Sequence, residues 1–406
     1  MKSLRSLFRI GHGPSSSHSI GPSRMALYIK TKYPDLKSVD VILYGSLAFT
    51  GKGHLTDSTI VSTFAPIPCN VTFDYKTSVD FPNTLDMILH FVDKSDIKKR
   101  CLSLGGGAIS IEGEKEEEDK EVYPQKNFAE IASFCKENKM DLAQYVEHYE
   151  GKEIWDYLKD VWDQMIKTIN NGLHTNGVLP GDLKVSRRAS SFLTPSHLKE
   201  SSFSRANRTL AAYAFATNEE NASGGVVVTA PTCGSSGTLP AVLLHMVDRY
   251  EIRDDVIIKA IAVAGVIGNV VKQNGSISGA EAGCQAEIGT ACSMAAAACS
   301  YLKGFTIDQI ECAAEAAMEH SLGATCDPVM GYVQIPCIER NAVAAVRALS
   351  ATYLAEYASS THRVSFDDIV QTMLETGRDM NKKYRETSEG GLALDFARKS
   401  SKKGEK

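Results

Sequence analysis

Hydrophobic and polar residues in the first hundred positions follow patterns typical of mixed α/β structure. Pro22 can open a helix as its first residue, and the apolar residues that follow it recur at helical spacing. Runs rich in β-branched and aromatic residues predict strands at 39–49, 71–73 and 108–111. This part of the chain is therefore predicted to combine helices with a sheet.

The pattern becomes almost entirely helical from Phe128 onward. The segment 153–170 is amphipathic, with its apolar residues on one helical face. Three further segments are apolar and rich in alanine, and they are separated by Gly or Asn: 256–271, 291–303 and 307–320. Helices with so many small residues can pack closely, which predicts a bundle with buried central helices.

The charged run 112–121 indicates a solvated loop, and we place the end of the first domain there. A chain of 406 residues is long for a single core, which also favours two domains. We predict a two-domain α+β protein. It has an N-terminal α/β domain over residues 1–125 and an all-helical domain over residues 126–406.

Charge and hydropathy argue against two classes of partner. The net charge is -5, whereas proteins that bind nucleic acids usually carry a basic face. The longest apolar stretch, 260–271, is shorter than the roughly 20 residues of a membrane span. Residues 1–10 contain basic side chains but no apolar run, so they do not form a secretory signal. We expect a cytoplasmic protein with neither nucleic-acid nor membrane partners.

The chain has ten cysteines, which the cytoplasm would keep reduced. Three of them occur in alanine-rich helical sequence and are expected to be small core residues: Cys292, Cys299 and Cys312. Three others occur beside residues that break or bend helices: Cys284, Cys326 and Cys337. Thiolates near irregular backbone suit an iron–sulfur cluster. Their spacing matches no local metal signature, so buried core cysteines or a three-thiolate zinc site stay open as alternatives.

Two polar segments of the first domain are candidates for chemistry. The segment 11–22 (GHGPSSSHSIGP) places Ser15, Ser16 and Ser17 just before a helix, where hydroxyl and N–H groups suit a carboxylate or phosphate. A capped loop would use the same residues. His54 follows the first predicted strand and could act as a base near neutral pH, or it could be a solvated loop residue.

Several segments together resemble one family, the bacterial iron–sulfur L-serine dehydratases. The matching text covers nearly the whole chain and includes GPSSSHSIGP, YGSLAFTGKGH, SISGAEAGCQAEIGTACSMAAA, MEHSLGATCDPV, VQIPCIERNA and DMNKKYRETSEGGLA. The resemblance implies an N-terminal domain related to serine-binding regulatory domains and a helical domain that holds a [4Fe–4S] cluster. It also implies a homodimer that converts L-serine to pyruvate and ammonia.

The same resemblance implies roles for individual residues. Cys284, Cys326 and Cys337 match the cluster ligands, which leaves one iron to act as a Lewis acid on the substrate. We take His54 as the first candidate for the base that removes the α-proton, and His18 as the second. The serines at 15–17 would hold the substrate carboxylate. Further polar residues are expected to complete the substrate site: Thr232, Asn274, Ser276 and Ser278.

The chain departs from the family pattern at two positions. Many one-chain members end with a cysteine shortly after GGLA, whereas here Arg398 lies near that place and no cysteine follows Cys337. The fourth iron would then be open to water or substrate. Leu55 stands where the family pattern leads us to expect glycine, which weakens the match around His54.

Other functions compete with this interpretation. An open-cluster hydro-lyase could act on a hydroxy acid, and a non-catalytic sensor could bind serine or report cluster oxidation. A pyridoxal-phosphate dehydratase is disfavoured because no lysine has the expected serine- and glycine-flanked setting. Turnover of L-serine would separate an enzyme from a sensor.

Overall fold

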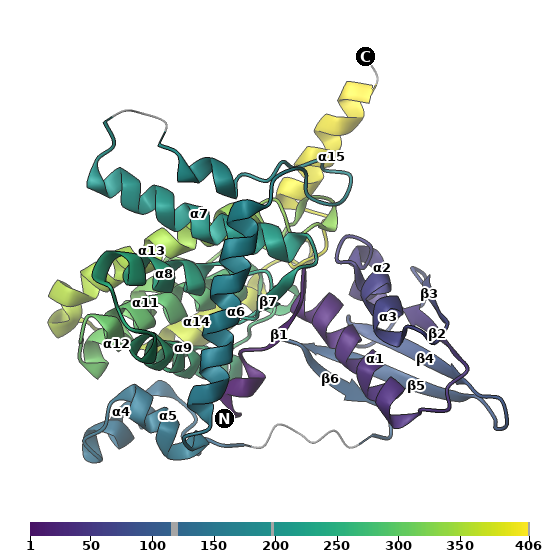
Figure 1. The fold of residues 1–406 in the computed structure, drawn as a ribbon, viewed down its shortest axis with the longest axis horizontal. Coiled ribbons are helices and arrows are strands. Elements are labelled where there is room, and N and C mark those ends of the chain that lie inside the picture. Colours follow the sequence, from purple (N-terminus) through teal and green to yellow (C-terminus); the bar gives the residue numbers. More distant parts are fainter. Residues whose placement is uncertain (115–120, 196–198, 405–406) are drawn as a thin grey trace.

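The computed structural model describes residues 1–114, 121–195 and 199–404, which form a sheet-containing part and a larger helical part (Figure 1). The sheet has five strands in the order β3-β2-β4-β5-β6. Strands β2 and β3 are parallel, and the other neighbours are antiparallel. The strands have these bounds: β2 Ser38–Leu43, β3 Cys69–Phe73, β4 Thr84–His90, β5 Ile97–Gly105 and β6 Ala108–Ile111.

The helices of this part are α1 Gly21–Lys32, α2 Gly45–Thr50 and α3 Thr56–Phe64. The predicted helix after Pro22 and the predicted strands at 71–73 and 108–111 are confirmed. The strand predicted over 39–49 is wrong beyond Leu43, because Gly45 turns the chain with a φ of 53° and α2 begins there. Strands β4 and β5 were not predicted.

The helical part surrounds a large apolar core. The apolar and amphipathic segments predicted as helices are helical, with these bounds: α6 Ile154–His174, α9 Asp254–Asn274, α11 Thr290–Leu302 and α12 Ile307–Glu319. Helix α11 is buried along almost its whole length and contacts α8, α9, α12 and α13, so small alanine side chains allow the close packing. Among the described residues, no helix is long and apolar enough to cross a membrane.

The other elements of this part are α4 Phe128–Glu137, α5 Leu142–Glu150, α7 Ser202–Ala222, β7 Val226–Val228, α8 Thr238–Tyr250, α10 Gly279–Ala282, α13 Cys337–Ala358, α14 Phe366–Asp379 and α15 Gly391–Gly404. Helix α15 projects from the helical part at the C-terminal end (Figure 1). The sheet-containing region followed by a helical region confirms the predicted α+β class.

The N-terminus begins inside the helical part and only then crosses to the sheet. Leu4 and Leu7 pack against α9, where a Cβ at Gly265 or Gly268 would lie only 2.8 or 2.7 Å from their methyl groups. Strand β1 (Ile10–His12) then pairs antiparallel with β7. The chain therefore enters the sheet-containing part through the segment 13–20, which lies at the junction of the two parts. The division at residue 125 stays a prediction.

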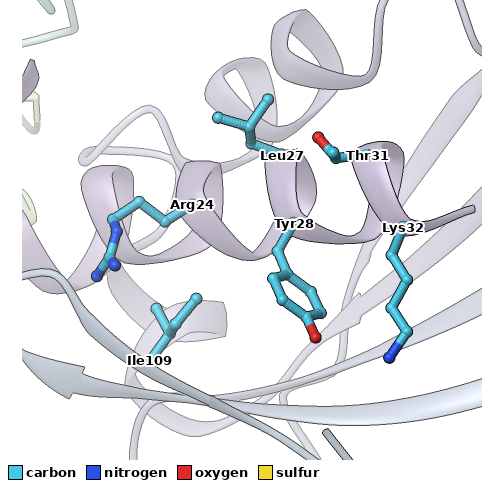
Figure 2. A pocket seen from close by; sticks show the side chains of 6 residues that line it. All are labelled: Arg24, Leu27, Tyr28, Thr31, Lys32 and Ile109. Atoms are coloured by element: carbon cyan, nitrogen blue, oxygen red, sulfur yellow. The ribbon is translucent and has the colours of Figure 1, made fainter. Parts of the chain in front are cut away.

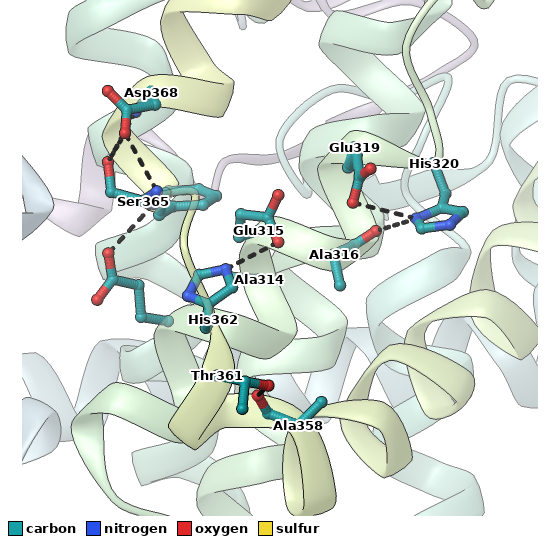
Figure 3. A network of polar contacts seen from close by, with 12 residues as sticks. Ala314, Glu315, Ala316, Glu319, His320, Ala358, Thr361, His362, Ser365 and Asp368 are labelled. Atoms are coloured by element: carbon teal, nitrogen blue, oxygen red, sulfur yellow. Dashed lines mark hydrogen bonds and ion pairs between the residues drawn. The ribbon is translucent and has the colours of Figure 1, made fainter.

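Polar contacts fix the start of α14 against α12 (Figure 3). His362 contacts Glu315 through its Nε2 at 3.0 Å, and the Phe366 N–H donates to Glu311 at 3.1 Å. Further along α14, the Met373 carbonyl accepts a hydrogen bond from Gln285, which directly follows Cys284. Helix α14 thus supports the segment that carries the first of the three candidate cysteines.

Candidate active site

The serine segment forms a tight turn at the junction of the two parts. Ser15 caps the helical turn Ser16–Ile20 by accepting a hydrogen bond from the His18 N–H at 3.1 Å. The Asn221 side chain donates to the Pro14 carbonyl at 2.9 Å, which ties the turn to α7. Ser15 and Ser16 are buried and line a narrow cavity, whereas Ser17 is half-buried and is not part of this lining.

His54 lies in the connection between α2 and α3 and lines the same cavity. Its Nδ1 lies 2.9 Å from the Thr50 carbonyl oxygen, which can only accept, so Nδ1 carries the proton and Nε2 is the basic nitrogen. Burial lowers the pKa of His54 to about 4. The ring is therefore neutral near pH 7 and able to accept a proton. Leu55 has a left-handed φ of 56°, a conformation that glycine adopts without strain.

His18 is buried beside His54 within a set of hydroxyl groups. The Thr50 hydroxyl donates to the Ser46 carbonyl and therefore accepts from His18 Nε2, 2.9 Å away. His18 Nδ1 faces the Ser15 hydroxyl at 3.4 Å. Burial, followed by the neighbouring His54, lowers the pKa of His18 well below its usual value. Both ring nitrogens of His18 are engaged, which suits an orienting residue better than a base.

The three candidate cysteines converge on the cavity from separate segments: Cys284 before α11, Cys326 in the loop after α12, and Cys337 at the first position of α13. Burial raises the pKa of the Cys284 thiol to about 11 and raises those of the other two well above the usual value. The charge of Arg340 acts on Cys284, and its guanidinium forms an ion pair with Asp327 at 3.2 Å. A fixed positive charge thus lies beside the thiols.

Two carboxyl groups also line the cavity, and sequence reasoning missed them: Glu287 and Glu386. Desolvation is the largest cause of the raised pKa of each carboxyl group. The charge of Glu287 raises the pKa of Glu386 further. Both residues lie inside segments that carry the family resemblance, but no spacing pattern marked either one. The sequence offered a signal only for Glu287, which lies three residues after Cys284.

The remaining predicted substrate residues lie at different distances from this cavity. The Thr232 hydroxyl and a Glu287 carboxyl oxygen lie 3.9 and 3.7 Å from the place of a Cβ on Gly234, so Thr232 adjoins the cavity. Asn274 donates to the Lys126 carbonyl, and Ser276 donates to Glu281 at 2.7 Å; neither is part of the cavity lining. Ser278 lines a neighbouring cleft of about 750 Å³, which Ser46 and Glu386 also line.

A separate hollow lies between α1 and β6 (Figure 2). It is lined by Arg24, Leu27, Tyr28, Thr31, Lys32 and Ile109. None of the predicted site residues contributes to this hollow. Across residues 1–114, 121–195 and 199–404, no three His, Cys, Asp or Glu side chains are arranged to hold a single metal ion.

Known proteins resemble this chain over nearly its whole length. The family model of the serine dehydratase alpha chain matches residues 111–393, and that of the serine dehydratase beta chain matches residues 3–66. The chain is 38% identical to an L-serine dehydratase of Haemophilus influenzae and 40% identical to L-serine dehydratase 1 of Escherichia coli. Each alignment covers 97% of this chain and 99% of the relative.

Proposed function

Because the chain belongs to the serine dehydratase family, it is an L-serine dehydratase, and we propose that Cys284, Cys326 and Cys337 hold a [4Fe–4S] cluster in its active site. The observation that supports the site is the convergence of these thiols with His54 and the serine turn on one cavity. The reaction removes water from L-serine and ends in pyruvate and ammonia.

The residues around the cavity fit such a cluster. Three thiols from three segments supply the donor set that iron–sulfur clusters use. Arg340 would offset part of the charge of the thiolates once they are deprotonated. The three thiols would supply three of the ligands of such a cluster. When bound, the cluster would supply a Lewis acid for the departing hydroxyl group.

His54 would remove the α-proton of L-serine through Nε2. The Thr50 carbonyl fixes the tautomer by holding Nδ1–H, and burial keeps the ring neutral. His18 would hold the serine turn and the neighbouring ring in place through Ser15 and Thr50. The proton thus moves to a nitrogen whose direction is set before the substrate binds.

The substrate carboxylate would bind the serine turn. Ser15 and Ser16 present hydroxyl groups at the cavity wall, next to the start of a helical segment. Elimination yields aminoacrylate, which tautomerises to an imine and hydrolyses in water to pyruvate and ammonia. The cytoplasmic location and the homodimer implied by the resemblance are also proposed here. Size-exclusion chromatography with light scattering would test the dimer.

Anaerobic reconstitution with iron and sulfide tests this proposal directly. We expect pyruvate release from L-serine by the reconstituted protein and none from a chelator-treated control. A clear cluster spectrum without pyruvate would overturn the assignment of this cavity to serine dehydration and would favour a hydroxy-acid hydro-lyase or a sensor. Pyruvate release that survives complete iron removal would overturn the cluster proposal alone.

A further inference from the structure

Glu287 and Glu386 have no role in the reaction described above, although both face its cavity. Glu287 lies in the helical turn that follows Cys284, and Glu386 lies in the loop between α14 and α15. A Cβ at Gly279 would lie 3.0 Å from both the Glu287 Oε2 and the Cys326 Sγ. The carboxyl group of Glu287 and the thiol of Cys326 therefore border the same small space, which glycine keeps open.

Glu386 occupies the boundary between the narrow cavity and the neighbouring cleft, because it lines both. Its N–H donates to the Cys326 carbonyl at 2.7 Å, and its φ is 56°, in the left-handed region. A backbone held in that region at a cavity wall indicates that the surrounding structure fixes the direction of the residue. Glu386 is thereby held against the loop of a cysteine ligand.

The two carboxyl groups have little positive charge to balance them. Within the part of the chain that the structure describes, no Lys or Arg side chain forms an ion pair with Glu386. Arg340 is the cation that acts on Glu287, and it is already shared with Asp327 and the thiols.

L-serine brings the missing cation as its ammonium group. We propose that Glu386, with Glu287 beside it, binds the ammonium group of the amino-acid substrate; this inference rests on the proposed function. The serine turn lies on the wall contributed by the N-terminal segment, whereas both glutamates belong to the helical part. Carboxylate, ammonium and hydroxymethyl groups would then attach to separate parts of the site, and three attachments around the α-carbon distinguish the two enantiomers of serine.

The test compares two ligands that differ only in the ammonium group. L-alanine carries it and propionate lacks it, and neither has a hydroxyl group to eliminate. Their inhibition constants against L-serine would be measured for the reconstituted wild-type enzyme and for Glu386→Gln, with calorimetric binding as a second readout. We expect Glu386→Gln to raise the inhibition constant of L-alanine by at least ~10-fold, as for the loss of a hydrogen bond between charged groups. The inhibition constant of propionate should change by less than ~2-fold.

Two control variants make this comparison specific. Glu389→Gln removes the same charge from a side chain that lines the cleft but not the narrow cavity, and it should leave both constants unchanged. Glu386→Asp keeps the carboxylate and should recover part of the affinity for L-alanine. The iron content and cluster spectrum of each variant show whether the cysteine site is intact.

If Glu386→Gln weakens the binding of L-alanine and of propionate equally, the inference is overturned, because the residue would then shape the cavity rather than bind ammonium. Unchanged affinity for both ligands would overturn it as well. Wild-type protein that forms a cluster but releases no pyruvate from L-serine would instead be a failure of the proposed function. The two failures are therefore distinguishable.

Discussion

The imidazole rings of His18 and His54 stack with their centroids 4.4 Å apart and their planes inclined by 28°. Both rings are buried, and the His54 ring contributes to the lowered pKa of His18. A charge on one ring therefore disfavours a charge on the other. The hydrogen bonds divide their roles, because His18 uses both nitrogens within the fold and His54 keeps Nε2 as its basic nitrogen.

Replacing His54 with alanine should lower the turnover number for L-serine by at least ~10²-fold, because the α-proton then has no positioned base. Steady-state pyruvate formation measures this effect. His174→Ala, at the exposed end of α6, is the matched control and should retain wild-type turnover. Near-normal turnover in His54→Ala with an intact cluster spectrum would remove His54 from the mechanism.

The buried histidines should make part of the folding stability depend on pH. The pKa of His54 is about 4 in the fold and near 6.5 in an unfolded chain, so only the unfolded chain binds this proton between those values. Stability should fall as the pH drops through that window. At pH 5, protonation of His54 in the unfolded chain should lower the free energy of unfolding by about 2 kcal/mol.

Urea unfolding of wild type and His54→Gln at pH 7 and pH 5 checks this dependence. The difference between the two proteins is the informative quantity, since Glu287 and Glu386 have raised pKa values and act in the opposite direction. The contribution of these half-buried carboxyl groups to the free energy of unfolding increases as the pH falls. An identical pH dependence in the two proteins would contradict the prediction.

Replacing Cys284, Cys326 or Cys337 with alanine should abolish retention of the cluster after anaerobic reconstitution. Iron per chain and the visible absorption spectrum measure the loss. Cys312→Ala provides a control, because this cysteine is buried in α12 and does not line the cavity. Normal iron content in any of the three variants would show that the replaced residue is not a ligand.

Gly172→Ala should destabilise the helical part by about 1–3 kcal/mol, as overpacking of a closed interface does. A Cβ at this position would overlap the backbone carbonyl of Ala216, so α6 and α7 would have to separate. Chemical unfolding measures the change. Asn171→Ala, at the exposed neighbouring position, should have little effect. Equal stability of the two variants would show that the helices adjust without cost.

The helical part was largely predictable from sequence because its segments are long and periodic. Helices α9, α11 and α12 agree with the predictions, which rested on apolar sequence segments rich in alanine. The sheet was harder to predict. Strand β5 (IKKRCLSLG) carries three charged residues among its nine, which obscure the apolar pattern, and Gly45 converts the end of a predicted strand into a helix.

The candidate site was predictable only in part, and for a different reason. The motifs identified Cys284, His54 and Ser15, and the structure brings them to one cavity. Glu386 could not be predicted in this way, because its position depends on a backbone contact with Cys326, far away in the chain. Asn274 lies in a polar segment near the cysteines, but its side chain binds the Lys126 carbonyl instead.

The packing of residues 2–7 against α9 has a consequence for biosynthesis. The Lys2 carbonyl accepts a hydrogen bond from Asn269, 267 residues away, and Leu4 and Leu7 fit against the glycines of the same helix. Residues 2–7 therefore have to wait for α9 to be translated before they can dock. Until then the serine turn is tethered on one side only, so the active site is completed late in synthesis.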